Sequence, residues 1–224
     1  MKKLLFSFVL MLIALSASAV DFETGMCKYR TTGTDEETGL KTVTCIGLST
    51  SYANSTEVGV PSTVYYNNEH YLVTSIGNAA FNGNKNLTKV ILSKGLQSIA
   101  SAAFGACSNL KEVYLPSTLT YVGNNAFLNC GNSLVIYAAW IDKVPTFGTT
   151  VFSNATSYST TVTRIYVPTR AGRDIVNADA TLNALSATVT VDPSKANDGQ
   201  LTLNSKNFFY VVTKMPTSSA DGEL

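Results

Sequence analysis

Three copies of one short motif, 23 residues apart, constrain this chain more than any other feature of its sequence. The motif begins as Ile-Gly-Asn-Ala-Ala-Phe at residues 76–81 and returns at residues 99–104 and 122–127. A second motif, Asn-Leu-x-x-Val-x-Leu, occupies residues 86–92 and recurs at 109–115. A fixed period of this length is typical of solenoids, in which each repeat buries its apolar side chains against its neighbours. The sequence therefore predicts a short, strand-rich repeat array.

The apolar residues of the repeat indicate how one coil is built. The Leu-x-x-Val-x-Leu segment is predicted to be the strand, with its Leu and Val side chains pointing inward. The Ala-Ala-Phe segment is predicted to form a short helical turn on the far side of the coil. Its phenylalanines, Phe81, Phe104 and Phe127, are then expected to stack as a ladder along the axis of the array.

The repeat is less regular outside this triplet. Residues 57–61 match the strand, but the next strand follows after 32 rather than 23 residues, which predicts an insertion of nine. We place the insertion at residues 65–71 as a protruding hairpin, because an Asn-Asn pair is flanked there by tyrosines. After the triplet, residues 134–139 fit the strand with one residue added before Leu134, and residues 164–168 fit a last strand.

Both ends of such an array are predicted to need a cap, because a terminal coil would expose apolar side chains and an open strand edge. The C-terminal cap is expected to be one amphipathic helix over residues 171–185, with a shared face made of Ile175, Ala178, Leu182 and Leu185. The chain then divides into a signal peptide at 1–19, an N-terminal β-hairpin cap at 20–55, the solenoid at 56–170, a C-terminal cap at 171–192, and a strand-like segment with a flexible tail at 193–224.

The first 19 residues have the layout of a secretory signal peptide. Lys2 and Lys3 form a basic start, residues 4–15 are a nearly unbroken apolar run, and residues 17–19 are a small-residue cleavage site. The apolar run is too short for a comfortable membrane span. We therefore expect a protein that is secreted or held at the cell surface, without a transmembrane segment.

The charge balance argues against nucleic acid as a partner. Removal of Lys2 and Lys3 with the signal peptide leaves 14 basic residues against 15 acidic ones, a formal net charge of −1. A near-neutral protein offers no electrostatic attraction to a phosphate backbone or an anionic membrane.

The four cysteines fall into two pairs. Cys27 and Cys45 lie in two β-patterned runs on either side of a polar turn, and a hairpin that sets Cys27 opposite Cys45 predicts a disulfide bond between them. An exported protein can keep such a bond. Cys107 and Cys130 are one repeat apart, so adjacent coils bring them close. We expect buried free thiols at these two positions rather than a second bond.

The repeat is similar to a known family. Ile-Gly-x-x-Ala-Phe, followed by Cys or Asn and then by Leu-x-x-Val-x-Leu-Pro, resembles the BspA-like, Treponema-type class of leucine-rich repeats, over residues 57–168. The resemblance implies a right-handed α/β leucine-rich-repeat solenoid with a strand-lined concave face. It also implies a secreted or surface bacterial protein, some of whose relatives bind host matrix proteins or other bacteria. Asn84 in place of Cys and Ser93 in place of Pro depart from the pattern.

Catalytic and metal-binding residues are hard to assemble from this sequence. The one histidine, His70, lies on the predicted hairpin, and the adjacent Glu69 points to the other side of the strand. A general base needs a held orientation and a partner carboxylate. The sequence also has no Gly-rich phosphate loop, no Cys-x-x-Cys pair and no His/carboxylate cluster with metal-ligand spacing. We therefore predict no enzyme activity, no cofactor and no bound metal.

Strand alternation predicts which side chains face outward. One outward row contains Gly59, Ile91, Tyr114, Ala138 and Tyr166, and the next contains Glu57, Lys89, Glu112, Ile136 and Arg164. Tyrosine is favoured in protein interfaces, although aromatic and β-branched residues also belong in strands for structural reasons. The predicted binding residues on the concave face are Lys89, Ile91, Glu112, Tyr114, Ile136, Arg164 and Tyr166.

Two functions stay open at this point. The first is a recognition or adhesion module that binds a protein or glycan at the cell exterior, on host matrix or another cell surface. The second is a structural or spacer domain without a ligand of its own. Loss of binding after combined Tyr114→Ala and Tyr166→Ala substitution, at a nearly unchanged melting temperature, would identify the first.

Overall fold

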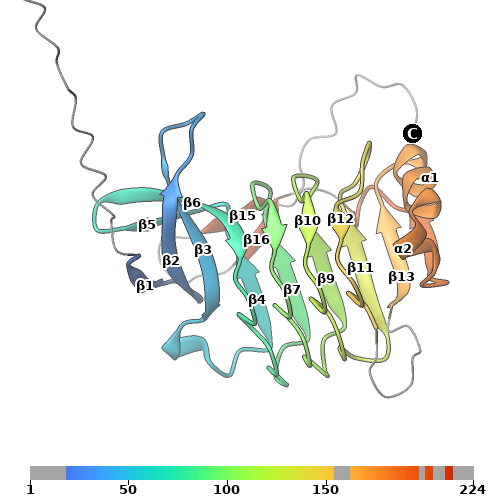
Figure 1. The fold of residues 1–224 in the computed structure, drawn as a ribbon, viewed down its shortest axis with the longest axis horizontal. Coiled ribbons are helices and arrows are strands. Elements are labelled where there is room, and N and C mark those ends of the chain that lie inside the picture. The colour runs from blue at the N-terminus through green and yellow to red at the C-terminus, as the bar shows by residue number, and fades with distance from the viewer. Residues whose placement is uncertain (1–18, 154–161, 197–199, 204–209, 214–224) are drawn as a thin grey trace, which may run out of the picture.

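The computed structural model describes residues 19–153, 162–196, 200–203 and 210–213 of the chain. Successive coils place their strands side by side along the long axis of the molecule (Figure 1). The described residues are rich in strands and have few helices. Residues 1–18 of the predicted signal peptide lie outside the described part of the chain.

A six-stranded parallel sheet carries the Leu-x-x-Val-x-Leu segments of the repeat. Its strands, in spatial and chain order, are β4 (Glu57–Val60), β7 (Lys89–Leu92), β9 (Glu112–Leu115), β11 (Leu134–Ala138), β13 (Val162–Val167) and β14 (Thr188–Val191). The 23-residue period sets the register, so that Lys89 lies opposite Glu112 and Val90 opposite Val113. The residues predicted to form the regular strands therefore do so.

The same coils build a second sheet that the repeat pattern did not predict. Ile99 and Val122, the first residues of the second and third motif copies, each end a two-residue strand that pairs in parallel with its neighbours. The sheet contains β1 (Asp21–Thr24), β2 (Cys27–Thr34), β3 (Lys41–Leu48), β6 (Glu69–Ile76), β8 (Ser98–Ile99), β10 (Tyr121–Val122) and β12 (Thr146–Phe147). The expected hairpin β2–β3 continues this sheet, because β3 pairs in parallel with β6.

The third side of each coil is a series of turns rather than the predicted helical turn. One residue in each copy has a left-handed backbone: Ala79 (φ 52°), Ala102 (φ 53°), Asn125 (φ 60°) and Thr150 (φ 53°). A residue in this conformation interrupts a right-handed helix, and backbone N–H groups bond to the next coil instead. The Phe81 N–H, for example, donates to the Ala103 carbonyl at 2.7 Å.

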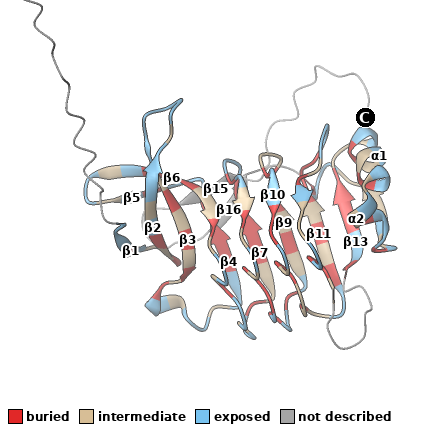
Figure 2. Ribbon diagram, in the orientation of Figure 1, coloured by how far each residue is buried: buried red, intermediate tan, exposed pale blue. Residues whose placement is uncertain are grey.

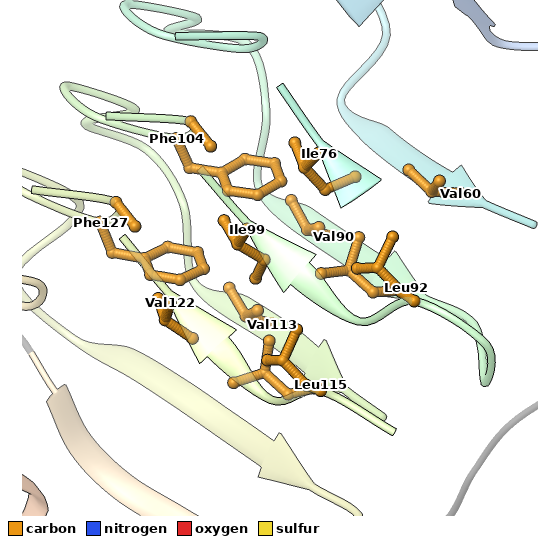
Figure 3. Close-up of a cluster of buried hydrophobic side chains, with 14 of the residues drawn as sticks. Val60, Ile76, Val90, Leu92, Ile99, Phe104, Val113, Leu115, Val122 and Phe127 are labelled. Carbon is orange, nitrogen blue, oxygen red and sulfur yellow. The ribbon is translucent and has the colours of Figure 1, made fainter. Parts of the chain in front are cut away.

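The core lies between the two sheets and these turns. Figure 3 shows side chains from all three sides of the coil in one cluster: Val60, Ile76, Val90, Leu92, Ile99, Phe104, Val113, Leu115, Val122 and Phe127. The predicted phenylalanine ladder is confirmed. Ring centroids are 5.0 Å apart from Phe81 to Phe104 and 5.2 Å from Phe104 to Phe127, and Phe152 extends the stack at 5.5 Å.

The predicted nine-residue insertion forms a hairpin. Strand β5 (Thr63–Tyr66) pairs antiparallel with β6, and Asn67 and Asn68 turn the chain with φ of 50° and 60°. Two asparagines at positive φ are typical of a tight hairpin turn. A short 3-10 helix (Thr50–Tyr52) precedes β4, and the strand-like C-terminal segment contains a separate antiparallel pair, β15 (Gln200–Leu203) and β16 (Tyr210–Thr213).

The single C-terminal helix predicted over residues 171–185 is wrong, because the structure has two helices. α1 (Arg170–Ala178) ends at Asp179, whose backbone is extended and whose carboxylate accepts from the Leu182 N–H at the start of α2 (Ala180–Asn183). An aspartate in this capping position starts a new helix. The predicted apolar face changes accordingly: Ala178 is exposed, whereas Val176 and Leu182 are buried.

Helix α1 packs closely against the backbone at Trp140. A β-carbon added to Gly172 in α1 would lie 2.2 Å from the carbonyl oxygen of Trp140, so only glycine permits this approach. Trp140 itself is buried and packs edge-on against Phe147 of β12.

The register predicted for the β2–β3 hairpin is wrong. Two bulges shift the pairing, so Cys45 lies opposite Tyr29 and Cys27 opposite Leu48. All four cysteines are buried free thiols. A side-chain hydrogen bond with Cys45 raises the pKa of Cys27 well above its usual value, so the two thiols are still neighbours. The disulfide bond between them stays a prediction.

Cys107 and Cys130 occupy equivalent places in adjacent coils, as their spacing predicted. The Cys107 thiol donates to the Phe81 carbonyl at 3.1 Å, and the Cys130 thiol donates to the Phe104 carbonyl at 3.2 Å. Burial raises the pKa of Cys107 to about 11 and that of Cys130 further. Two such thiols are neutral at physiological pH and serve as small buried donors.

Candidate functional site

The six-stranded sheet has one fully buried face and one partly exposed face. Val90, Val113 and Ile165 point into the core and are at most 1% exposed. Among the outward residues, Ile91 in β7 and Tyr166 in β13 are also buried, at 9% and 8% exposed. In β9 and β11 the outward residues are partly exposed and alternate with buried ones (Figure 2). This alternation is the period expected for strands with a core on one side. The side chains of the outward rows are not needed to fill the core, so a functional site on this sheet would be built from them.

Two residues of the predicted outward rows are placed wrongly. Ile136 lies opposite Val113 and is completely buried, so it cannot contact a ligand, and Ala138 also faces the core. The prediction added one residue before Leu134 and carried that shift through the strand. In the structure Ile136 takes the place of the repeat's Val. It follows Leu134 by two positions, whereas Val113 follows Leu110 by three, so the added residue is compensated at once.

The corrected register places Tyr137 and Val135 on the outer face. Tyr137 lies between Tyr114 and Tyr166, and Val135 lies between Glu112 and Arg164. Strict alternation starting from the buried Leu134 was the signal that could have identified Tyr137 in the sequence. The outer row therefore contains one more tyrosine than predicted.

Three tyrosines form a continuous stack across β9, β11 and β13, which we call the tyrosine ladder (Tyr114, Tyr137 and Tyr166). Ring centroids are 4.3 Å apart between Tyr114 and Tyr137, at an angle of 12°, and 5.1 Å apart between Tyr137 and Tyr166, at an angle of 5°. Ile91 precedes Tyr114 in the row and is itself buried. The spacing of neighbouring strands matches the spacing of stacked rings, which is why one aromatic per strand is enough.

Cations lie over both ends of the tyrosine ladder. The Nζ atom of Lys89 is 5.5 Å from the centre of the Tyr114 ring. The Nζ atom of Lys195 is 4.7 Å from the centre of the Tyr166 ring, and the Arg164 guanidinium is 5.8 Å from it. Contacts of this kind are attractive because a cation favours the negative face of the ring. Lys195 follows the last strand of the sheet, and the repeat pattern gave no indication of it.

The hydroxyl groups at the two ends have different electrostatic surroundings. Burial, reinforced by the carboxylate of Glu112, raises the pKa of Tyr114. At the other end, the Arg164 Nη1 donates to the Tyr166 hydroxyl at 3.0 Å, and this hydrogen bond is the largest influence that lowers the pKa of Tyr166. Burial also raises the pKa of Tyr137. The tyrosine ladder is therefore polarised along its length.

The geometry decides how the tyrosine ladder can contact another molecule. Tyr137 has a ring on each face, and the outer faces of Tyr114 and Tyr166 carry Lys89 and Lys195. A sugar ring that stacks on an aromatic face would find these faces occupied. The Tyr114 hydroxyl donates to Glu112, and the Tyr166 hydroxyl accepts from Arg164 on a residue that is 8% exposed. A partner can therefore contact only the ring edges and the hydrogen-bonding capacity that these neighbours leave uncovered.

Glu112 connects the tyrosine ladder to a shallow depression. Its carboxylate is 4.0 Å from the Lys89 ammonium and accepts from the Tyr114 hydroxyl at 3.5 Å. Both contacts are long, so this carboxylate keeps capacity to accept further hydrogen bonds. The depression lies beside the starts of β9 and β11 and is lined by Asn109, Lys111, Glu112, Asn132, Ser133 and Val135, among others.

The structure brings no catalytic group together around His70. Its imidazole packs against the ring of Tyr65 across the hairpin, at 4.8 Å between ring centres. The neighbouring Glu69 is engaged elsewhere, because both of its oxygens accept from Lys41 and one also accepts from Tyr71. The described residues contain no group of three or more His, Cys, Asp or Glu side chains that could hold a metal ion. None of the helices in this part of the chain is long and apolar enough to cross a membrane.

Comparison with protein families identifies the repeat. Residues 53–167 match six copies of the model described as "BspA type Leucine rich repeat region". No curated protein is significantly similar to the chain.

Several solved structures of bacterial proteins are similar to part of the chain. A leucine-rich repeat protein from Bacteroides capillosus is 23% identical, with a TM-score of 0.44, over 66% of this chain and 97% of its own. A leucine rich cell surface protein from Faecalibacterium prausnitzii is 19% identical, with a TM-score of 0.43, over 84% of this chain and 57% of its own. A leucine-rich repeat protein from T. pallidum is 19% identical, with a TM-score of 0.42, over 64% of this chain and 69% of its own.

Proposed function

Since the chain belongs to the BspA-type leucine-rich repeat family, we propose that it is a non-catalytic recognition module that binds a protein through the outer face of its six-stranded sheet. The binding residues are the tyrosine ladder together with Lys89, Ile91, Glu112 and Arg164, and with Val135 in place of the buried Ile136. Glycan stacking, which the sequence left open, is disfavoured because the ring faces are covered.

One observation carries this proposal: a stack of three tyrosines on the one face of the sheet that the core does not need. Aromatic side chains with a polar tip dominate protein interfaces, because they bury a large area at a low cost in side-chain entropy. A stacked row loses still less freedom on binding, since its rotamers are already fixed by neighbours. The face is therefore preorganised for a partner.

The proposal includes the setting of this module. A signal peptide at 1–19 would export the chain to the cell surface or the medium, where the partner is a host-matrix or cell-surface protein. The parts before and after the repeats, 20–55 and 171–192, would act as caps, because β2–β3 and α1 lie at the two ends of the array (Figure 1).

The test compares a ladder variant with a matched surface variant. Tyr137→Ser removes the central ring, and Tyr121→Ser removes an exposed tyrosine, 42% accessible, from β10 in the other sheet. Immobilised wild-type protein and both variants are incubated with purified host-matrix and bacterial surface proteins, and binding is measured by surface plasmon resonance. We expect Tyr137→Ser to weaken binding by at least roughly ten-fold, as for an interface hot spot, and Tyr121→Ser to have no effect.

The alternative function, a structural spacer, makes the opposite prediction. A spacer would bind none of these proteins, or would bind them equally well after Tyr137→Ser. In that case the stacked tyrosines would serve only the stability of the sheet, and Tyr137→Ser would lower the melting temperature without any other effect.

A further inference from the structure

The two ends of the tyrosine ladder differ in charge. At the β9 end, the ammonium of Lys89 is accompanied by the carboxylate of Glu112. At the β13 end, Arg164 and Lys195 both approach Tyr166. Lys195 pairs with Asp192 at 3.5 Å, whereas no carboxylate in the described part of the chain pairs with Arg164. The β13 end therefore carries an uncompensated positive charge.

Three side chains at the β13 end carry hydrogen-bond donors: Arg164, Tyr166 and Lys195. The Tyr166 hydroxyl accepts from the Arg164 guanidinium at 3.0 Å, and the Lys195 ammonium lies 4.7 Å from the centre of the Tyr166 ring. Because its oxygen accepts from Arg164, the Tyr166 hydroxyl still has a proton to donate, on a residue that is 8% exposed. Arg164 keeps further N–H groups beyond the one used on Tyr166, and its side chain is exposed. Three donor groups thus converge on one place with a net positive charge.

We infer that the β13 end of the tyrosine ladder binds a carboxylate, presented by an acidic peptide segment of the protein partner. This inference rests on the proposed function and specifies its ligand chemistry. A carboxylate would accept from the Arg164 guanidinium and from the Tyr166 hydroxyl, with Lys195 beside it. Charge-assisted hydrogen bonds of this type are short and about twice as strong as neutral ones.

An acidic peptide fits the face better than a sulfated polysaccharide. The charge of Lys195 is partly compensated by its ion pair with Asp192. Glu112 lies two strands away from Arg164, in the same outward row. A chain with an anion on every unit would bring one of its charges close to Glu112, which repels it. A peptide can place an acidic side chain at Arg164 without placing another beside Glu112. Its backbone N–H groups can also donate hydrogen bonds to the Glu112 carboxylate.

The experiment selects short peptides from a random displayed library on the purified wild-type protein. Recovered peptides are synthesised, and their Kd is measured by fluorescence polarisation for wild type, Arg164→Gln, Tyr137→Ser and the control Arg173→Gln. Arg173 is a partly exposed arginine on α1 that pairs with the adjacent Asp174. Low-molecular-weight heparin is titrated in parallel, and the melting temperature of each variant confirms that it folds.

The inference expects enrichment of Asp and Glu in the recovered peptides. Their Kd should rise roughly 10- to 100-fold for Arg164→Gln, the effect of losing a hydrogen bond to a charged group, and stay unchanged for Arg173→Gln. Replacement of the acidic residues in the peptide by Asn and Gln should cause a similar loss. Higher salt should also weaken binding.

Other outcomes separate this inference from the proposed function. Peptides that lose affinity with Tyr137→Ser but not with Arg164→Gln, or that show no acidic enrichment, would overturn the carboxylate site and leave the recognition module intact. Heparin binding that depends on Arg164, without peptide binding, would replace the peptide by a sulfated glycan. If neither Tyr137→Ser nor Arg164→Gln affects any ligand, both proposals are wrong.

Discussion

Single residues of the turn side show where this chain carries backbone strain. Each turn contains a second left-handed position, filled by Gly83 in one coil, Ala106 in the next and Asn129 in the third. Glycine and asparagine adopt this conformation readily, whereas alanine pays a penalty of about 1–2 kcal/mol because of its β-carbon. Ala106 is also exposed, so its methyl group makes little compensating contact with the core.

We predict that Ala106→Gly stabilises the protein. The relief of strain exceeds the added flexibility of glycine in the unfolded chain, so the free energy of unfolding should rise by about 0.5–1 kcal/mol. Thermal unfolding followed by circular dichroism would report a melting temperature about 1–4 °C higher. The matched control is Ala103→Gly, at a buried position without positive φ, which should lower the melting temperature. A decrease for Ala106→Gly would contradict the assignment of strain to this position.

Cys27 and Cys45 provide a second prediction at this scale. If the protein is exported, the two neighbouring thiols should oxidise to a disulfide bond and stabilise the folded state by about 3 kcal/mol, the value for a loop of this length. Alkylation of denatured, unreduced protein followed by mass spectrometry should then label Cys107 and Cys130 only. Substitution of Cys107 by Ser should leave the bond intact. Labelling of all four cysteines would show that the bond does not form.

At the scale of elements, the regular strands could be predicted because their core residues recur at a fixed spacing. The phenylalanine ladder followed from the same spacing. The short strands of the second sheet could not be predicted, since two residues such as Ser98–Ile99 carry too little pattern and depend on pairing with neighbouring coils. Tyr137 was missed because one inserted residue inverts the faces of a strand. Lys195 was missed because only the fold brings it to Tyr166.

Disruption of the phenylalanine ladder should lower the stability of the whole fold. Phe104 is completely buried and stacks on both Phe81 and Phe127. Truncation in Phe104→Ala should lower the free energy of unfolding by about 3–5 kcal/mol, measured by urea denaturation. Phe104→Leu, which keeps much of the volume, should cost clearly less. Equal losses for the two variants would indicate that the stacked ring is not what stabilises the coil.

At the scale of the whole molecule, the repeats form a short array in which each coil packs mainly against its two neighbours. Stability in such a chain is a sum of coil and interface contributions, and a short array should unfold as one cooperative unit. Trp140, the one tryptophan of the chain, is buried near the helices and reports on the last coils. Phe81 begins the ladder several coils away.

We therefore predict that a destabilising substitution in the first coil also lowers the unfolding midpoint of the last coils. Phe81→Ala should shift the midpoint of urea unfolding seen by Trp140 fluorescence as far as the midpoint seen by far-ultraviolet circular dichroism, because the first coil cannot open alone. Tyr121→Ser, an exposed change in the same array, serves as the control and should leave both midpoints in place. If Phe81→Ala instead separated the two transitions, the coils near Trp140 would be stable without the first coils. The tyrosine ladder, which lies on β9, β11 and β13, would then belong to an independently folding part, and its binding should survive the loss of the first coils.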